Sequence, residues 1–154
     1  MALEVVYGNK LKDRLNQLLT KTTPEKFKLK IVSQHIHNAS INGSNFLEKI
    51  TRLVKGQVEI IIIINRKVLV GDKKEQALVE QLEHLGVKIF PKKSIHAKII
   101  LLEGKNRNCL LVSSLNISDT AIHESKEAGI YVENEHINLI NDTRTYIMSI
   151  LGES

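Results

Sequence analysis

The sequence has a single cysteine, Cys109, and no tryptophan among its 154 residues. One thiol cannot form a disulfide within the chain or supply a zinc site built from several cysteines. Cys109 lies in an apolar, strand-like stretch, which favours a small buried side chain over a reactive thiol. Aromatic residues make up only 4% of the chain, which disfavours recognition of single-stranded nucleic acid by base stacking.

Long apolar runs are also missing. The longest one, Ile60 to Ile64, is far too short to span a bilayer. The N-terminal residues MALEVVYGNK contain no basic segment followed by an apolar one, so we expect no signal peptide and, by default, a cytoplasmic protein. No amphipathic anchor or aromatic cluster is evident in the sequence, so we expect no membrane partner.

Basic residues exceed acidic ones, 22 to 17, which gives a net charge of +5. This excess favours an anionic partner such as nucleic acid or phospholipid. The length suits one domain with a single core, and the sequence shows no internal repeat, linker or low-complexity segment. We therefore expect one domain over residues 1–154.

The spacing of apolar residues predicts strands and helices that alternate through the first two-thirds of the chain. We expect strands at residues 3–7, 27–33, 58–64, 87–90, 96–103, 108–114 and 127–133, and helices at residues 9–20, 45–55, 73–85 and 134–151. Capping boxes begin two of these helices, Asn45 with Glu48 and Asp72 with Glu75. This order predicts an α/β fold with a mixed β-sheet flanked by helices on both faces.

Residues suited to phosphate chemistry gather in one part of the sequence. His96 and Lys98 stand two positions apart on an expected strand, so both side chains project to the same face. The next strand ends with Ser113, Ser114 and Asn116, and an antiparallel hairpin would bring them beside that pair. Imidazole can attack or shuttle a proton, and the other groups can donate hydrogen bonds to a phosphate. The alternative is that these are ordinary exposed strand residues and a turn cap.

This stretch resembles the phospholipase D superfamily. The family motif is His-x-Lys, four residues, Asp, then Gly/Ser-Ser-x-Asn, with a Glu or similar residue further on. His96-Ala97-Lys98 and Ser114-Leu115-Asn116 match it, and Glu127 follows eleven residues after Asn116. The resemblance implies the half-unit of the phospholipase D fold and a metal-independent phosphodiesterase.

The sequence departs from that motif at three points. Glu103 stands where the family usually has Asp, Ser113 stands where it often has Gly, and the hairpin turn is longer by about three residues. The family Asp is thought to be mainly structural, so the resemblance implies a structural role for Glu103.

The motif occurs once, whereas larger members of the superfamily carry it twice. The segment at His35 lacks the lysine, and the one at His123 has the wrong spacing. Covalent in-line transfer needs a nucleophile on one side of phosphorus and an acid on the other. A two-fold dimer supplies both, so we expect a homodimer with one composite site.

The resemblance also implies a role for each residue. His96 of one subunit would form a phosphohistidine, and His96 of the other would protonate the leaving oxygen and then activate water. Lys98 and Asn116 would hold the non-bridging oxygens, with a further hydrogen bond from Ser114. Glu127 would accept a hydrogen bond from the second ring nitrogen of His96. No metal or other cofactor is expected.

Other residues are candidates for substrate contact, namely Ser113, Lys93 and His35. His35 and His37 follow the first long strand; their spacing could suggest a metal, but no third ligand is evident, and a polar loop is the simpler interpretation. Lys92 and Lys93 could bind backbone phosphates, or they could be a solvated charged run.

The resemblance implies a phosphodiesterase, and the positive charge and small size favour nucleic acid over lipid, so we expect a nuclease of low sequence specificity that acts on DNA or RNA. One compact domain leaves little room for a base-reading module, so a partner protein could confer specificity. Two alternatives stay open: a phosphodiesterase that hydrolyses phospholipids, and a catalytically silent dimer that only binds nucleic acid.

Overall fold

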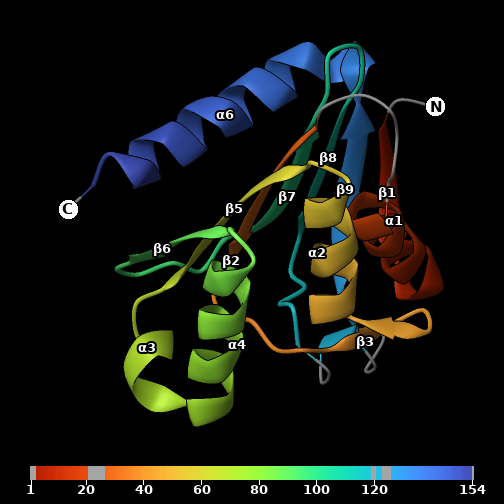
Figure 1. The fold of residues 1–154 in the computed structure, drawn as a ribbon. Helices are drawn as coiled ribbons and strands as arrows, with labels where there is room; N and C mark the ends of the chain where they lie inside the picture. The colour runs from red at the N-terminus through yellow and green to blue at the C-terminus, as the bar shows by residue number, and fades with distance from the viewer. Residues whose placement is uncertain (1–2, 21–26, 119–120, 123–125, 154) are drawn as a thin grey trace.

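Seven strands form one mixed sheet in the computed structural model, which describes residues 3–20, 27–118, 121–122 and 126–153. The strand order is β1-β9-β8-β7-β2-β5-β6 (Figure 1). The bounds are β1 Leu3–Tyr7, β2 Lys28–Ser33, β5 Glu59–Asn65, β6 Lys88–Lys92, β7 Lys98–Glu103, β8 Asn108–Ser113 and β9 Ala128–Glu133. Strands β2, β5 and β6 are parallel, and the other neighbours are antiparallel. The expected mixed sheet is therefore confirmed.

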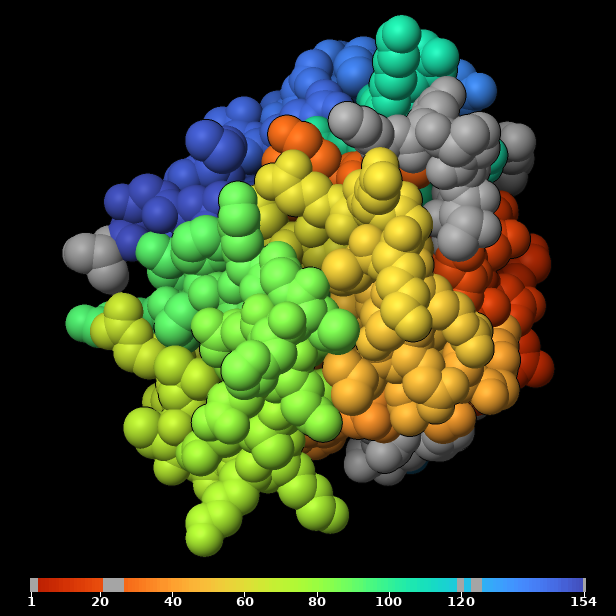
Figure 2. All heavy atoms as spheres, viewed as in Figure 1, coloured from red at the N-terminus to blue at the C-terminus, as the bar shows by residue number. Residues whose placement is uncertain are grey.

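Helices cover both faces of this sheet (Figure 1). One face carries α1 (Gly8–Thr20), α2 (Phe46–Lys55), α3 (Val68–Gly71) and α4 (Lys73–His84); the other carries α6 (Ile137–Leu151), which follows the short turn η1 (Asn134–His136). A small hairpin, β3 (Ser40–Ile41) with β4 (Ser44–Asn45), lies in the loop after β2. The space-filling view shows α2 and α4 side by side over the sheet (Figure 2). Among the described residues, none of the helices has the length and apolar character needed to cross a membrane.

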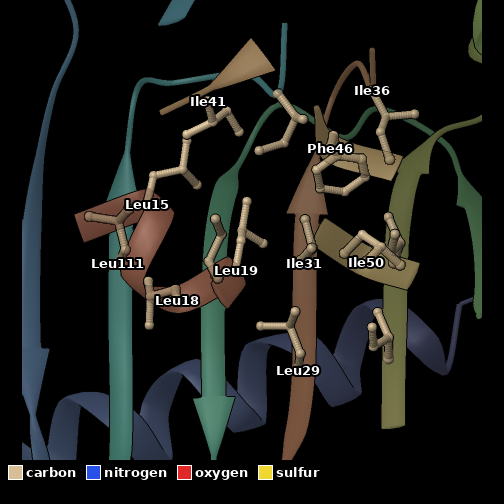
Figure 3. Close-up of a cluster of buried hydrophobic side chains, with 14 of the residues drawn as sticks. Leu15, Leu18, Leu19, Leu29, Ile31, Ile36, Ile41, Phe46, Ile50 and Leu111 are labelled. Atoms are coloured by element: carbon tan, nitrogen blue, oxygen red, sulfur yellow. The ribbon is translucent and has the colours of Figure 1, made fainter. Parts of the chain in front are cut away.

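The isoleucine run of β5 explains how the sheet is anchored. Successive strand residues point to opposite faces. Ile62 and Ile64 pack in the core beneath α1, α2 and α4, whereas Ile63 packs beneath α6. All three are fully buried, so an unbroken apolar strand is needed where both faces are covered. Figure 3 shows the first of these cores, with leucines of α1 and Phe46 and Ile50 of α2 packed over the strands.

Helix α2 begins at the residue that its capping box predicts. Asn45 Oδ1 accepts a hydrogen bond from the backbone N–H of Glu48 at 2.8 Å. Helix α4 begins after Asp72, whose Oδ1 accepts from the N–H groups of Lys74 (2.7 Å) and Glu75 (3.3 Å). The Glu75 side chain turns toward the loop after β2.

The strand directions bring several strand ends to one edge of the sheet. The carboxyl ends of β2, β5, β6 and β8 and the amino ends of β7 and β9 all lie there. We call this the His96 edge. Ligands of open α/β sheets bind at the carboxyl ends of the strands, so this is the edge where a site is expected.

Candidate active site

The β7–β8 hairpin places Lys98 directly opposite Ser113. Residues 99–102 of β7 and 109–111 of β8 are buried in the two cores, which fixes the hairpin at the end of the sheet. The predicted juxtaposition of these two side chains is therefore confirmed. Strand β7 starts at Lys98, so His96 lies in the segment that leads into it, with an exposed side chain. The strand expected at residues 96–103 was therefore wrong at its start, because His96 lies before β7.

Asn65 holds the segment that carries His96. It ends β5, is 6% exposed, and donates a hydrogen bond from Nδ2 to the carbonyl oxygen of Ile95 at 3.2 Å. Its Oδ1 accepts from the backbone N–H of Lys67 at 3.0 Å. Sequence reasoning missed this residue, although a single amide at the end of an otherwise apolar strand is a usable signal, because a buried amide must find partners.

Ser114 and Glu127 are joined directly. Ser114 Oγ donates a hydrogen bond to Glu127 Oε2, and Ser114 Oγ accepts one from the backbone N–H of Ala128 at 3.2 Å. Ser113 lies opposite Gly129, where an added Cβ would stand 2.7 Å from the Ser113 Cβ, so the close approach of β8 and β9 requires glycine. In the described part of the chain no hydrogen bond joins Glu127 to His96, and its role as a partner of that ring stays a prediction.

Asn116 is attached to the loop after β2. The backbone N–H of His37 donates to the carbonyl oxygen of Ile117 at 2.7 Å. Ser33, 1% exposed, donates from Oγ to the carbonyl oxygen of His35 at 2.5 Å and accepts from the N–H of Ile117 at 3.4 Å. Asn116 Oδ1 is buried and has no hydrogen-bond partner among the described residues. Buried polar atoms are normally paired, so this oxygen can accept a hydrogen bond from a donor at the site.

A cavity of about 460 Å³ joins Asn116 to both histidines of that loop. Glu75 Oε1 accepts hydrogen bonds from His35 Nδ1 (3.1 Å) and His37 Nε2 (2.6 Å). His35 stays half-exposed at the cavity rim, compatible with the expected contact to substrate. Glu75 itself was expected only as part of a capping box, because nothing in the local sequence links it to histidines about forty residues earlier.

A second cavity, of about 340 Å³, is lined by three basic residues. Arg66 and Lys67 follow β5, and Lys93 follows β6. Lys92 faces elsewhere: its Nζ donates to the carbonyl oxygens of Leu151, at 3.2 Å, and Glu153. Of the two lysines considered for phosphate binding, Lys93 is therefore available and Lys92 holds the end of α6.

Glu103 lies at the other end of β7 from Lys98. Its carboxylate forms ion pairs with Lys30 Nζ at 2.7 Å and Arg144 Nε at 2.6 Å. Burial acts to raise the pKa of Glu103, but the hydrogen bonds from Lys30 and Arg144 outweigh it and hold the pKa below its ordinary value. Glu103 thus links β2, β7 and α6 and is absent from the His96 edge. His123, which aligned with no motif, lies outside the described residues.

The fold and this edge define an α/β protein with one His-x-Lys hairpin and a Ser-x-Asn segment beside it. The sequence profile described as "Cardiolipin synthase, PLD-like domain" matches residues 18–149. The chain therefore belongs to the PLD-like domain family of the phospholipase D superfamily. No curated protein gave a significant match to the sequence.

Several solved structures have a similar fold. Nuc of Salmonella typhimurium, a phospholipase D family member, is 13% identical with a TM-score of 0.73, and the match covers 97% of this chain and 93% of that one. NucT of Helicobacter pylori is 14% identical with a TM-score of 0.72, over 97% and 94% of the two chains. Polyphosphate kinase of Porphyromonas gingivalis is 13% identical with a TM-score of 0.76; the match covers 99% of this chain but only 26% of the kinase.

Proposed function

We propose that this protein is a metal-independent phosphodiesterase that acts on nucleic acid, as a nuclease of low sequence specificity. The observation that carries the proposal is the pairing of Lys98 with Ser113 at the edge where His96 and Asn116 also lie. An imidazole, an ammonium and an amide at one edge suit the binding and displacement of a phosphodiester.

The basic cavity supports nucleic acid as the substrate. Arg66, Lys67 and Lys93 line it, and Lys67 also lines the cavity that contains Asn116. A continuous basic path can follow several phosphates of a polymer, whereas a single lipid headgroup needs one anion site.

In the proposed reaction His96 attacks phosphorus, and the bond to the leaving oxygen breaks as the second His96 donates a proton to that oxygen. Water, deprotonated by the second His96, then attacks the phosphohistidine and restores the first ring. Lys98 and Asn116 stabilise the charge on the non-bridging oxygens. Ser114 and Glu127, which are hydrogen-bonded to each other, border this site.

A second copy is needed for the second histidine, and one face of the sheet is suited to receive it. Ile99, Val112, Ile130 and Val5 stand in register across four neighbouring strands. Ile99 is buried beneath α6, but the other three are 42%, 46% and 64% exposed. This row is the next one along the strands from the Lys98–Ser113 pair, and it points to the opposite, α6 face of the sheet. A copy that covered the row would therefore lie against that face, close to the His96 edge. Exposed apolar rows of this kind mark interaction surfaces.

The decisive assay incubates the untagged protein with plasmid DNA and with RNA in excess EDTA, beside His96→Ala. The matched control is His84→Ala, which removes an exposed histidine from α4. Cutting that persists in EDTA, survives in the control and falls by about 10²–10⁴-fold or more in His96→Ala supports the proposal. Turnover confined to phospholipid vesicles, or binding of nucleic acid without cutting, would overturn it in favour of the lipase or the silent binder.

A further inference from the structure

Four potential metal ligands meet where α4 begins and the loop after β2 passes. They come from two distant segments: His35 and His37 from the loop, Asp72 and Glu75 from the start of α4. One ligand atom from each of His37, Asp72 and Glu75 lies within 4.8 Å of the other two. The sequence offered no third ligand for the His-x-His pair, and the tertiary structure supplies two carboxylates.

Glu75 lies at the centre of this cluster, and only one of its two carboxylate oxygens has a hydrogen-bond partner among the described residues. Its side chain is 4% exposed. Oε1 receives both histidines, but Oε2 is buried and has no hydrogen-bond partner among the described residues. A buried carboxylate oxygen without a partner is destabilising, so Glu75 Oε2 is suited to bind a cation.

We propose that His37, Asp72 and Glu75, with His35 as a fourth ligand, bind a divalent transition-metal ion of the Zn²⁺ type. Two imidazoles and two carboxylates form a mixed nitrogen and oxygen set, which Zn²⁺ accepts and which Mg²⁺ and Ca²⁺ do not prefer. Zn²⁺ lies about 2.0–2.2 Å from such ligands, so their atoms stand about 3.3–3.6 Å apart around a tetrahedron.

The cluster needs only small movements to reach that geometry. A hydrogen bond of 2.6 Å joins His37 Nε2 to Glu75 Oε1, so the ion would replace the proton of this bond and separate the two atoms slightly. Asp72 uses Oδ1 to cap α4, which fixes its carboxylate beside the first turn. The half-exposed rings of His35 and His37 give the ion a route from solvent.

The ion would clamp the β2 loop to α4. That loop also holds the Asn116 segment through the hydrogen bond from His37 N–H to Ile117. The metal site and Asn116 line the same cavity of about 460 Å³. Its role is therefore to stabilise one wall of the candidate active site, and the phosphodiester reaction does not pass through it.

The test measures Zn²⁺ binding to the full chain without a histidine tag, after removal of metal by a chelator. Isothermal titration and the visible spectrum of bound Co²⁺ report affinity and coordination without any use of turnover. Wild type is expected to bind one ion per chain. Glu75→Gln and His37→Gln are expected to weaken binding by at least about tenfold, since even residues that only orient ligands contribute about 10–100-fold.

Matched controls come from the same helix. Glu80→Gln and His84→Gln change an exposed carboxylate and an exposed imidazole of α4 and should bind the ion as wild type does. Asp72→Asn serves as a further variant that folds, because Asn caps a helix as well as Asp does, and it should also weaken binding. Absence of stoichiometric binding, or equal binding by wild type and all three cluster variants, would overturn the proposal. A failure of the nuclease assay would leave this result untouched.

Discussion

Asn65 and Ile95 are joined across thirty residues of sequence by a hydrogen bond from the Asn65 amide to the Ile95 carbonyl oxygen, at 3.2 Å. Ile95 immediately precedes His96 and is itself 4% exposed. The bond therefore ties the segment of the exposed imidazole to the end of β5, whose isoleucines 62–64 are fully buried. It makes Asn65 a positioning residue for the candidate nucleophile.

Asn65→Ala should lower the rate of cutting at saturating substrate more than it weakens substrate binding. It also removes two hydrogen bonds, one buried and one partly buried, at about 1–3 kcal/mol of unfolding free energy. Ile62→Val in the same strand costs about 0.5–1.5 kcal/mol without touching the Ile95 segment, and it serves as the stability control. Steady-state kinetics with chemical denaturation checks both; a kcat unchanged by Asn65→Ala would refute the positioning role.

If each active site needs His96 from both subunits, a His96→Ala subunit should inactivate every dimer that it joins. When the variant and wild type are refolded together in equal amounts, only dimers with two intact histidines cut, so activity should fall to about one quarter of the wild-type value. Independent subunits would instead retain about half. Refolding with His84→Ala, whose change is an exposed histidine of α4, should leave activity unchanged.

Ile130→Lys should dissociate the proposed dimer. The side chain stands in the exposed apolar row of β8, β9 and β1, and a lysine there would be buried without a partner in the assembly. Loss of a central apolar contact costs about 2 kcal/mol or more, which raises Kd about thirtyfold or more. Sedimentation velocity measures it. Val70→Lys, at an 82% exposed position of α3, is the control that should stay dimeric.

Lys93→Gln should weaken nucleic-acid binding equally across sequences. If Lys93 neutralises one phosphate, the slope of log K against log salt should become less steep by about 1. Binding would be measured with inactive His96→Ala protein over a range of salt concentrations. Lys55→Gln changes an exposed lysine at the end of α2, near the amino end of β5 and thus at the far edge of the sheet, and should leave the slope as it was.

Glu103→Gln should lower stability by about 1.5–3 kcal/mol at neutral pH, because charge-assisted bonds to Lys30 and Arg144 are lost. The folded pKa of Glu103 lies below 4.5, so its contribution is complete above pH 4.5 and disappears as the pH falls through the folded pKa. The difference in unfolding free energy between the two proteins should shrink accordingly in acid. Glu59→Gln, at a half-exposed carboxylate, provides the comparison; a pH-independent difference would contradict the ion-pair explanation.

Local patterns predicted most of the fold. The isoleucine run of β5, the capping residues Asn45 and Asp72, and the β7–β8 hairpin depend on neighbours in sequence, on strand or helix period and on short turns. The same reasoning placed Lys98 beside Ser113. It erred by two residues on the start of β7, because the apolar pattern alone does not show that the chain leaves the sheet before His96.

The sequence by itself determined the α/β order, the family motif and the meeting of the His-x-Lys and Ser-x-Asn segments, since strand period and hairpin pairing act over short separations. Only the tertiary structure decided that Asn65 holds the His96 segment, that Lys92 binds the end of α6, and that Glu75 receives two histidines. These contacts join residues between thirty and sixty positions apart. They arise from how helices and loops pack over the sheet, and the spacing of residues in the sequence does not predict that packing.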